Sequence, residues 1–423
     1  NWQHPGEMIS RHSCREKGVD VSTAPQVVFD AFHPMHRANP YPRYAAVRDF
    51  AALYPIRPDI LMATRYEECS AVFTDALWGH GYEEGINPFR PGVAPDDVPG
   101  SMLRMDPPNH TRMRGLVKRA FVPRNTEGLR QQIEDLVNTL LDTAIEAGEV
   151  DLMEAFARPL PLTVIGDMLG IPPEDYPAVQ KWSLEIVRGT DPDILQSPES
   201  LARRPEAMRE FEAYFAALLA QRRKDPRDDM LSGMCAAEDR GELSSREALG
   251  LSVGLLIGGY ETVSDLIGKG VVALLRNPDQ IALWLADPDL AAPAVDELLR
   301  YEPPVQFTHR VALAERELAG HTFARGDGIV VLTAAANRDP AVYTDPECLD
   351  ITRFAGRTPA PRHLSFSEGL HYCLGAHLGR LETQIAVDTL LRRVPGLSLT
   401  DEPVWRDTVA IHGLDTLPVR LRD

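Results

Sequence analysis

One long helix dominates what this chain of 423 residues can fold into. Ser244 and Glu247 form a capping-box pattern, in which each side chain bonds to a backbone N–H at the start of a helix. Helical periodicity then continues to about Arg276, just before Pro278. At 1.5 Å per residue, a helix of about 30 residues is about 45 Å long, enough to cross a whole domain. The sequence therefore predicts a fold organised around one central helix.

The middle of this helix carries two consecutive glycines, followed by an acid and a hydroxyl. Gly258 and Gly259 each cost about 1 kcal/mol relative to alanine, which indicates that bare backbone is needed there against something flat or bulky. Glu261 and Thr262 follow in an apolar stretch, where a buried carboxylate is costly unless it is paired or used. Two interpretations fit. Either the glycines pack against another helix while Glu261 reaches solvent, or the acid and the hydroxyl form a proton relay.

A cysteine near the C-terminus has the surroundings of a metal-binding thiolate. The segment Phe366-Ser-Glu-Gly-Leu-His371-Tyr-Cys373-Leu-Gly375 runs into residues 374–393, where apolar residues recur at helical spacing. The N–H groups and the dipole at a helix N-terminus favour a thiolate over a thiol. A deprotonated sulfur that a flat cofactor can approach is what heme iron requires of a cysteine ligand. The alternative is that Cys373 is a small buried apolar residue, as most free cysteines are.

Both segments resemble motifs of the cytochrome P450 family. The pattern Phe-x-x-Gly-x-His-x-Cys-x-Gly is similar to the family's heme-ligand loop, and Gly-Gly-x-Glu-Thr is similar to its oxygen-activating helix. The cofactor implied is heme b. The resemblance implies that Cys373 is the axial iron ligand, that Phe366, Gly375, Gly258 and Gly259 line the heme site, and that Thr262 and Glu261 are catalytic, supplying protons to dioxygen.

Two positions depart from the family pattern. Ser367 and Glu368 replace the Gly-x that usually precedes the glycine of the motif, which alters the polarity of the loop near the sulfur. His412 stands where relatives often have arginine before Gly-Leu. Neither departure affects the ligand or the relay.

A structural salt-bridge triad is also implied. Glu297 and Arg300 are three residues apart, so they share one helix face, and alone they are typical of a surface pair. With Arg353 downstream, they resemble the family's buried triad, which braces the loop that leads to the cysteine.

The two carboxylates of heme need cationic partners. His110 and Arg114 are four residues apart and share a helix face. Arginine–carboxylate contacts are among the strong hydrogen bonds, whereas His110 alone is typical of a surface residue. The resemblance assigns the heme carboxylates to His110, Arg114, Arg310 and His371.

Charge and cysteine usage exclude several classes of function. A net charge of −18 argues against nucleic acid as a partner, because phosphate binding requires a basic surface. The five cysteines are odd in number and lack CxxC spacing, so neither a disulfide framework nor a zinc site is indicated. With no signal-peptide pattern and no run of about 18 apolar residues, the sequence predicts a cytoplasmic protein without a membrane span.

One short segment reverses the acidic balance. Residues 109–124 contain arginines and a lysine but no acid. Because the sequence has no flavin-binding or iron–sulfur motif, the resemblance implies an external electron donor, a ferredoxin with its ferredoxin reductase. Arg112, Lys118 and Arg119 are predicted to dock an acidic ferredoxin by electrostatic steering. The alternative is that these cations only solvate a helix.

The remaining pattern predicts a mainly α protein with a minor β region, the cytochrome P450 fold, with heme buried between the central helix and the cysteine loop. Residues 1–39 are predicted to form an N-terminal arm, and residues 40–423 a single heme-binding domain with a helix-rich lobe and a smaller β-rich lobe. Helices are expected over 42–53 and 67–75, a strand over 60–65, and hairpins over 306–331. Residues 78–108 are expected to be irregular, and residues 110–234 mostly helical, with interruptions at Pro172-Pro173 and between Asp191 and Pro205.

The predicted function is a heme-thiolate monooxygenase that hydroxylates or epoxidises a small organic molecule. Oxidative coupling, nitration or peroxygenase chemistry on the same scaffold stays open. A non-catalytic heme sensor is disfavoured, because it would not need the acid and hydroxyl of the central helix. The substrate is expected to be a medium-sized natural product of bacterial secondary metabolism, free or bound to a carrier protein. Its pocket is expected at residues 78–102, Gly258, Leu255, Val305, Gln306, Phe307, Ile411 and His412.

Overall fold

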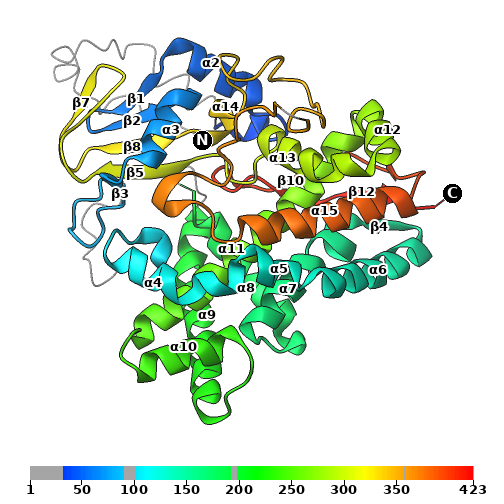
Figure 1. Cartoon of the computed structure of the whole chain (residues 1–423), viewed down its shortest axis with the longest axis horizontal. Helices are drawn as coiled ribbons and strands as arrows, with labels where there is room; N and C mark the ends of the chain where they lie inside the picture. Colours follow the sequence, from blue (N-terminus) through cyan, green and yellow to red (C-terminus); the bar gives the residue numbers. More distant parts are fainter. Residues whose placement is uncertain (1–31, 90–100, 192–197, 357, 423) are drawn as a thin grey trace.

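The computed structural model describes residues 32–89, 101–191, 198–356 and 358–422, so the arm predicted for residues 1–39 lies largely outside it. The described chain is predominantly helical (Figure 1). Its α-helices are α2 (Tyr41–Phe50), α3 (Tyr66–Thr74), α4 (Asn109–Val117), α5 (Pro123–Glu127), α6 (Arg130–Ala147), α7 (Pro159–Leu169), α8 (Tyr176–Arg188), α9 (Pro198–Lys224), α10 (Met230–Asp239), α11 (Ser245–Leu275), α12 (Pro278–Ala286), α13 (Ala291–Tyr301), α14 (Thr333–Ala336) and α15 (Ala376–Arg393).

Short strands complete the described fold. In the largest sheet the strand order is β1-β2-β8-β5-β3, with β2 parallel to β8 and the other pairs antiparallel. The strands are β1 (Leu53–Arg57), β2 (Ile60–Ala63), β3 (Trp78–Gly79), β4 (Glu149–Asp151), β5 (Thr308–Ala312), β6 (Arg316–Leu318), β7 (His321–Phe323), β8 (Gly328–Val331), β9 (Ser398–Leu399), β10 (Val404–Trp405), β11 (Leu414–Thr416) and β12 (Pro418–Arg420).

The central helix is confirmed. In α11, the Ser244 hydroxyl accepts from the backbone N–H of Glu247, and the Glu247 carboxylate accepts from the backbone N–H of Ser244. The helix packs against α7, α9 and α15, and it passes through the middle of the molecule (Figure 1). Most of its second half is buried. Burial on several sides explains how an apolar helix of this length is accommodated within the fold.

Strands and helices are segregated. The large sheet lies with α2, α3 and α14 at one side, and most helices lie at the other (Figure 1). The expected hairpins over 306–331 correspond to β5, the β6–β7 hairpin and β8. None of the described helices combines the length and hydrophobicity needed to span a bilayer.

Two details differ from the expected secondary structure. The helix expected over 42–53 ends at Phe50, and residues 53–57 form β1, an edge strand that contains Pro55. Proline lacks an N–H donor, but an edge strand has one side without a neighbour and tolerates it. The second detail is α9, which begins at Pro198 and continues through Pro205. Residues 192–197 of the expected interruption lie outside the described residues.

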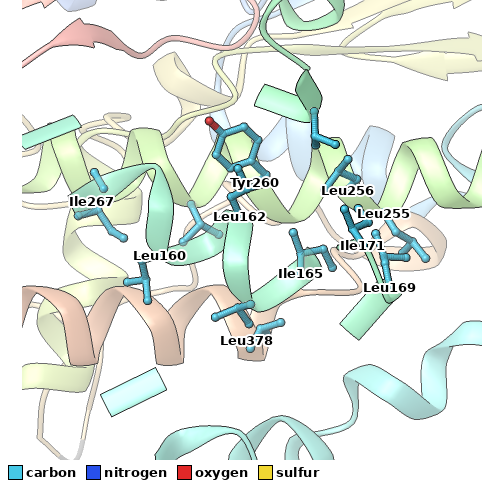
Figure 2. Close-up of a cluster of buried hydrophobic side chains, with 14 of the residues drawn as sticks. Leu160, Leu162, Ile165, Leu169, Ile171, Leu255, Leu256, Tyr260, Ile267 and Leu378 are labelled. Carbon is cyan, nitrogen blue, oxygen red and sulfur yellow. The ribbon is translucent and has the colours of Figure 1, made fainter. Parts of the chain in front are cut away.

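The largest hydrophobic core joins α11 to α7 and α15. Tyr260 and Leu256 of α11, Ile165 of α7 and Leu378 of α15 belong to one cluster of buried side chains (Figure 2). Smaller clusters lie at α2 with the sheet and around α12 and α13. The helix that begins after the cysteine loop is therefore packed directly on the central helix.

A buried salt-bridge triad holds the segment before the cysteine loop. The Arg300 guanidinium donates to both carboxylate oxygens of Glu297 at 2.7 Å, and Arg353 Nε lies 3.2 Å from each of them. Arg300 also donates to the carbonyls of Pro346 and Cys348. Because Glu297 and Arg300 are fully buried, neither charge can be satisfied by water if its partner is lost.

Replacing Arg300 with methionine should destabilise the protein by about 3–5 kcal/mol, because it leaves the buried Glu297 carboxylate without its main partner. Denaturant unfolding followed by circular dichroism measures the change. Arg130→Met is the matched control, since Arg130 also pairs with an acid three residues away, Glu127, but both side chains are exposed. Its cost should be within about 1 kcal/mol. Equal costs for the two variants would show that Glu297–Arg300 is not a structural pair.

Candidate functional site

Cys373 lies in a tightly held loop just before α15. Its backbone N–H donates to the Phe366 carbonyl at 2.8 Å, and the Phe366 ring packs under the Arg380 guanidinium, 4.5 Å from ring centre to carbon. Gly369 has a φ of +65°, and a side chain there would collide with the Phe73 carbonyl of α3. The absence of a side chain at Gly369 therefore allows the loop to approach α3 closely. Gly375 has open space where a Cβ would lie.

The electrostatics of Cys373 differ from the simple helix-terminus expectation. Burial raises the pKa of the Cys373 thiol above its ordinary value, although the Gly375 N–H and the charges of Arg114 and Arg380 act in the opposite direction. The reason is that Cys373 is only partly exposed, so protein atoms replace much of the water that would solvate a thiolate charge. A bound metal ion supplies the compensating charge and deprotonates a coordinating thiol. A coordinated metal ion would therefore add to the stabilisation that Arg114 and Arg380 already give to the thiolate.

The two glycines of α11 face different surroundings. A Cβ on Gly258 would meet no atom within 4 Å, whereas a Cβ on Gly259 would lie 3.0 Å from Ile165 of α7. Successive helical residues are rotated by about 100°, so they cannot both face one flat partner. The two glycines therefore do not form the one continuous surface without side chains that the sequence predicted. Gly258 borders open space, while Gly259 permits close packing of α7.

Thr262 and Glu261 are likewise on different sides of α11. The Thr262 hydroxyl donates to the Gly258 carbonyl at 2.8 Å, one turn earlier, which leaves its oxygen able to accept a further hydrogen bond. Glu261 is 2% exposed and lies 3.4 Å from the guanidinium of Arg406. Burial raises the pKa of Glu261, and the Arg406 charge opposes that shift. Glu261 is therefore buried and paired, and it does not reach solvent.

Arg406 connects Glu261 to a second buried acid that the sequence interpretation missed. The Arg406 guanidinium donates to both oxygens of Asp265 at 3.0 Å, and both side chains are fully buried. Asp265 is four residues after Glu261 on α11, so both acids share one helix face. Only the combination of an apolar helix and a second acid at that spacing could have indicated the pair. Nothing near Arg406 marks its role.

The four residues predicted at the heme carboxylates lie close together. The rings of His110 and His371 are 4.2 Å apart, and Arg114 donates to the Tyr372 carbonyl at 2.7 Å, next to Cys373. Arg310 is 4% exposed, and none of the described carboxylates forms an ion pair with it. Burial lowers the pKa of Arg310 to about 10.

These residues fit an anionic ligand. Nδ1 of His110 is buried and has no hydrogen-bond partner among the described residues. A buried polar atom without a partner costs about 1–3 kcal/mol, and a buried guanidinium without a carboxylate is also costly. A ligand with two carboxylates beside a cysteine would satisfy these groups. The donor set and the open space at Gly258 and Gly375 therefore fit heme.

The predicted docking residues are not equivalent. The Arg112 guanidinium donates to the Glu242 carbonyl and to the carboxylate of Glu247 at the start of α11. The charge of Arg112 is thus paired with that of Glu247 within the protein. Lys118 and Arg119, in the 3-10 turn after α4, are exposed. Of the three predicted docking residues, Lys118 and Arg119 are therefore the two whose charges stay available to an acidic partner.

The predicted pocket residues serve several purposes. Leu255 is buried in the same hydrophobic cluster as Leu169 and Ile171, whose side chains lie near it (Figure 2). Val305 pairs with Ile411 in an antiparallel bridge, so the two expected segments do meet. The remaining three residues contact other parts of the protein. Gln306 donates to the Pro303 carbonyl, and the Phe307 ring lies 5.4 Å from that of Phe32. His412 stacks on Trp405 and forms hydrogen bonds with Lys269 and the Arg37 carbonyl.

Comparisons with known proteins identify the family of this chain. The family model for cytochrome P450 matches residues 289–396, which include Glu297 and Cys373. The 6-deoxyerythronolide B hydroxylase of Saccharopolyspora erythraea is 35% identical over 95% of this chain and 100% of its own length. Cytochrome P450 monooxygenase PikC of Streptomyces venezuelae is 37% identical over 91% of this chain and 92% of its own length.

A solved structure shows the same fold. P450BioI, in complex with acyl carrier protein ligated to hexadec-9Z-enoic acid, matches with a TM-score of 0.84 and 34% identity, over 92% of this chain and 100% of its own. The mainly α architecture, the cysteine loop and the sequence relatives agree. This chain belongs to the cytochrome P450 family, and it is a heme-dependent monooxygenase.

Proposed function

We propose that this monooxygenase binds heme b with Cys373 as the axial ligand and hydroxylates or epoxidises a polyketide-like natural product. The observation that supports the cofactor assignment most strongly is the cluster of His110, His371, Arg114 and Arg310, which lies beside the cysteine loop without a bound carboxylate partner. The substrate class is supported by the relatives, since one is named as a 6-deoxyerythronolide B hydroxylase and another is named for polyketide biosynthesis.

When bound, heme with a thiolate ligand supplies the activation of dioxygen. The residues of this chain have separate roles around that chemistry. The Thr262 oxygen, held by its hydrogen bond to the Gly258 carbonyl, orients an acceptor toward the open side of α11. Glu261 holds a proton or releases it within the buried network with Arg406. A heme sensor would not need either residue, so their presence favours an enzyme.

The electron donor is proposed to be a ferredoxin reduced by a ferredoxin reductase, in the cytoplasm. Lys118 and Arg119 are exposed and lie on the short turn that follows α4, the helix of Arg114. Arg114 in turn bonds to the residue before Cys373. An acidic protein docked at these cations would be on the cysteine side of the site. Delivery of a substrate on a carrier protein is compatible with the carrier complex of P450BioI.

Turnover under isotopically labelled dioxygen tests the proposed reaction. The protein, reconstituted with heme, ferredoxin and reductase, is incubated with a panel of macrolactones. We expect a product that contains one labelled oxygen atom. A product that forms without label, or only with added peroxide and no electron donor, would contradict the proposal and favour coupling or peroxygenase chemistry.

Thr262→Ala should lower the amount of product formed per reduced nicotinamide consumed by about tenfold or more, because the positioned hydroxyl is lost. Ser264→Ala is a matched control. The Ser264 hydroxyl also donates to a carbonyl one turn earlier on α11, that of Tyr260 at 2.9 Å, but it is buried in the core. Its coupling should match that of the unchanged protein. Full coupling in Thr262→Ala would exclude the assigned role.

Reversing both exposed cations, in Lys118→Glu with Arg119→Glu, should slow reduction by ferredoxin about tenfold at low ionic strength and leave substrate affinity unchanged. Stopped-flow reduction measures the rate, and the difference should shrink as salt screens the charges. The control reverses two exposed arginines of the β-rich side, Arg57 and Arg325, with the same change in net charge. If both double variants are slowed equally, net charge rather than a docking site is responsible.

A further inference from the structure

His80 is a buried histidine that the sequence interpretation did not single out. It directly follows strand β3 and is 5% exposed. Its ring meets that of His371 edge to face, with centroids 4.8 Å apart, and the ring of His309 is 6.1 Å away. Nδ1 of His80 is buried and has no hydrogen-bond partner among the described residues. Buried polar atoms of native proteins nearly always form a hydrogen bond, so this nitrogen indicates that a bonding partner binds beside it.

The backbone of His80 is fixed on both sides. Its N–H lies 2.9 Å and 3.0 Å from the two carboxylate oxygens of Asp106, which also accept from the N–H of Gly81 at 2.9 Å. The carboxamide of Asn87 donates to the His80 carbonyl at 2.7 Å. Side chains from two other segments thus hold this backbone, while the imidazole they position has a buried nitrogen without a partner. This arrangement indicates that His80 binds a ligand rather than only filling space in the core.

Among the described residues, no acceptor is recorded within hydrogen-bond distance of Nδ1 of His80. Arg310 and His371 are neighbours, and burial, aided by the Arg310 charge, holds the pKa of His80 well below its ordinary value. Its imidazole is therefore neutral and has one N–H to donate. The nearby carboxylate, Asp106, already accepts from two backbone N–H groups. A ligand carboxylate would supply the acceptor that none of the described residues provides to Nδ1 of His80.

We propose that His80 donates a hydrogen bond to a carboxylate of the bound heme, as an additional member of the group formed by His110, Arg114, Arg310 and His371, and that Asp106 positions it. This inference rests on the proposed heme site. His80 contacts His371, which is two residues before Cys373, so the assignment extends the carboxylate site to the segment between β3 and α4.

The rate at which heme leaves the holoenzyme for excess apomyoglobin tests this role. His80→Phe retains a flat ring but removes the N–H, and it should release heme about tenfold faster. His80→Gln restores a donor and should return the rate to within about threefold of the unchanged protein. His321→Phe is the matched control, because His321 also makes an edge-to-face ring contact, with Phe323 at 4.7 Å, but it lies on β7. Its rate should not change.

Chemical modification of the ligand separates binding from packing. With heme dimethyl ester, whose carboxylates are neutral esters, the difference between the unchanged protein and His80→Phe should fall below about threefold. Asp106→Asn should speed heme loss in the unchanged protein and have little additional effect in His80→Phe, since it acts through His80.

These experiments distinguish a failure of the proposed heme site from a failure of the role assigned to His80. If the unchanged protein takes up no heme, the proposed function itself fails. If it holds heme normally but His80→Phe changes the rate less than twofold, the role of His80 is excluded. Equal acceleration in His80→Phe and His80→Gln, or a difference that persists with the ester, would indicate a packing role and overturn the inference.

Discussion

The proposed heme site depends on how the negative charge of a cysteine thiolate is stabilised where protein atoms replace much of the water. Burial raises the pKa of the Cys373 thiol even though two arginines and a backbone N–H favour the thiolate. Metal coordination changes this balance, because it removes the proton outright. In the heme complex that we propose, Cys373 would lose its proton on coordination and donate electron density to the metal, as heme-thiolate chemistry requires.

The rest of the fold maintains the geometry of that ligand. The α15 helix, which begins three residues after Cys373, packs on α11, so the sulfur is fixed relative to Gly258 and Thr262. The buried pair of Glu297 and Arg300 holds the carbonyls of the segment that leads into the loop. The buried contacts that stabilise the fold therefore also fix the position of the cysteine loop. Each of these contacts joins segments that are distant in sequence, so the site exists only in the complete fold.

Local patterns predicted much of the architecture. The capping box at Ser244 and the proline at 278 marked the ends of α11, and the spacing around Cys373 marked the ligand loop. Other features could not be predicted because their cause is not local. Arg406 bonds to Asp265 across 141 residues, and His80 is held by Asp106 and packed against His371. The edge strand β1 was not predicted, because it contains Pro55 and a proline in a short apolar run normally argues against a strand.

The carbon monoxide spectrum of the reduced, heme-reconstituted protein tests the central claim most directly, because it reports whether the axial ligand is a thiolate. The account predicts the strongly red-shifted Soret band of thiolate ligation in the unchanged protein, its retention in Cys348→Ser, whose sulfur is exposed, and its loss in Cys373→Ser. An unshifted band in the unchanged protein, or a red-shifted band that survives Cys373→Ser, would contradict it.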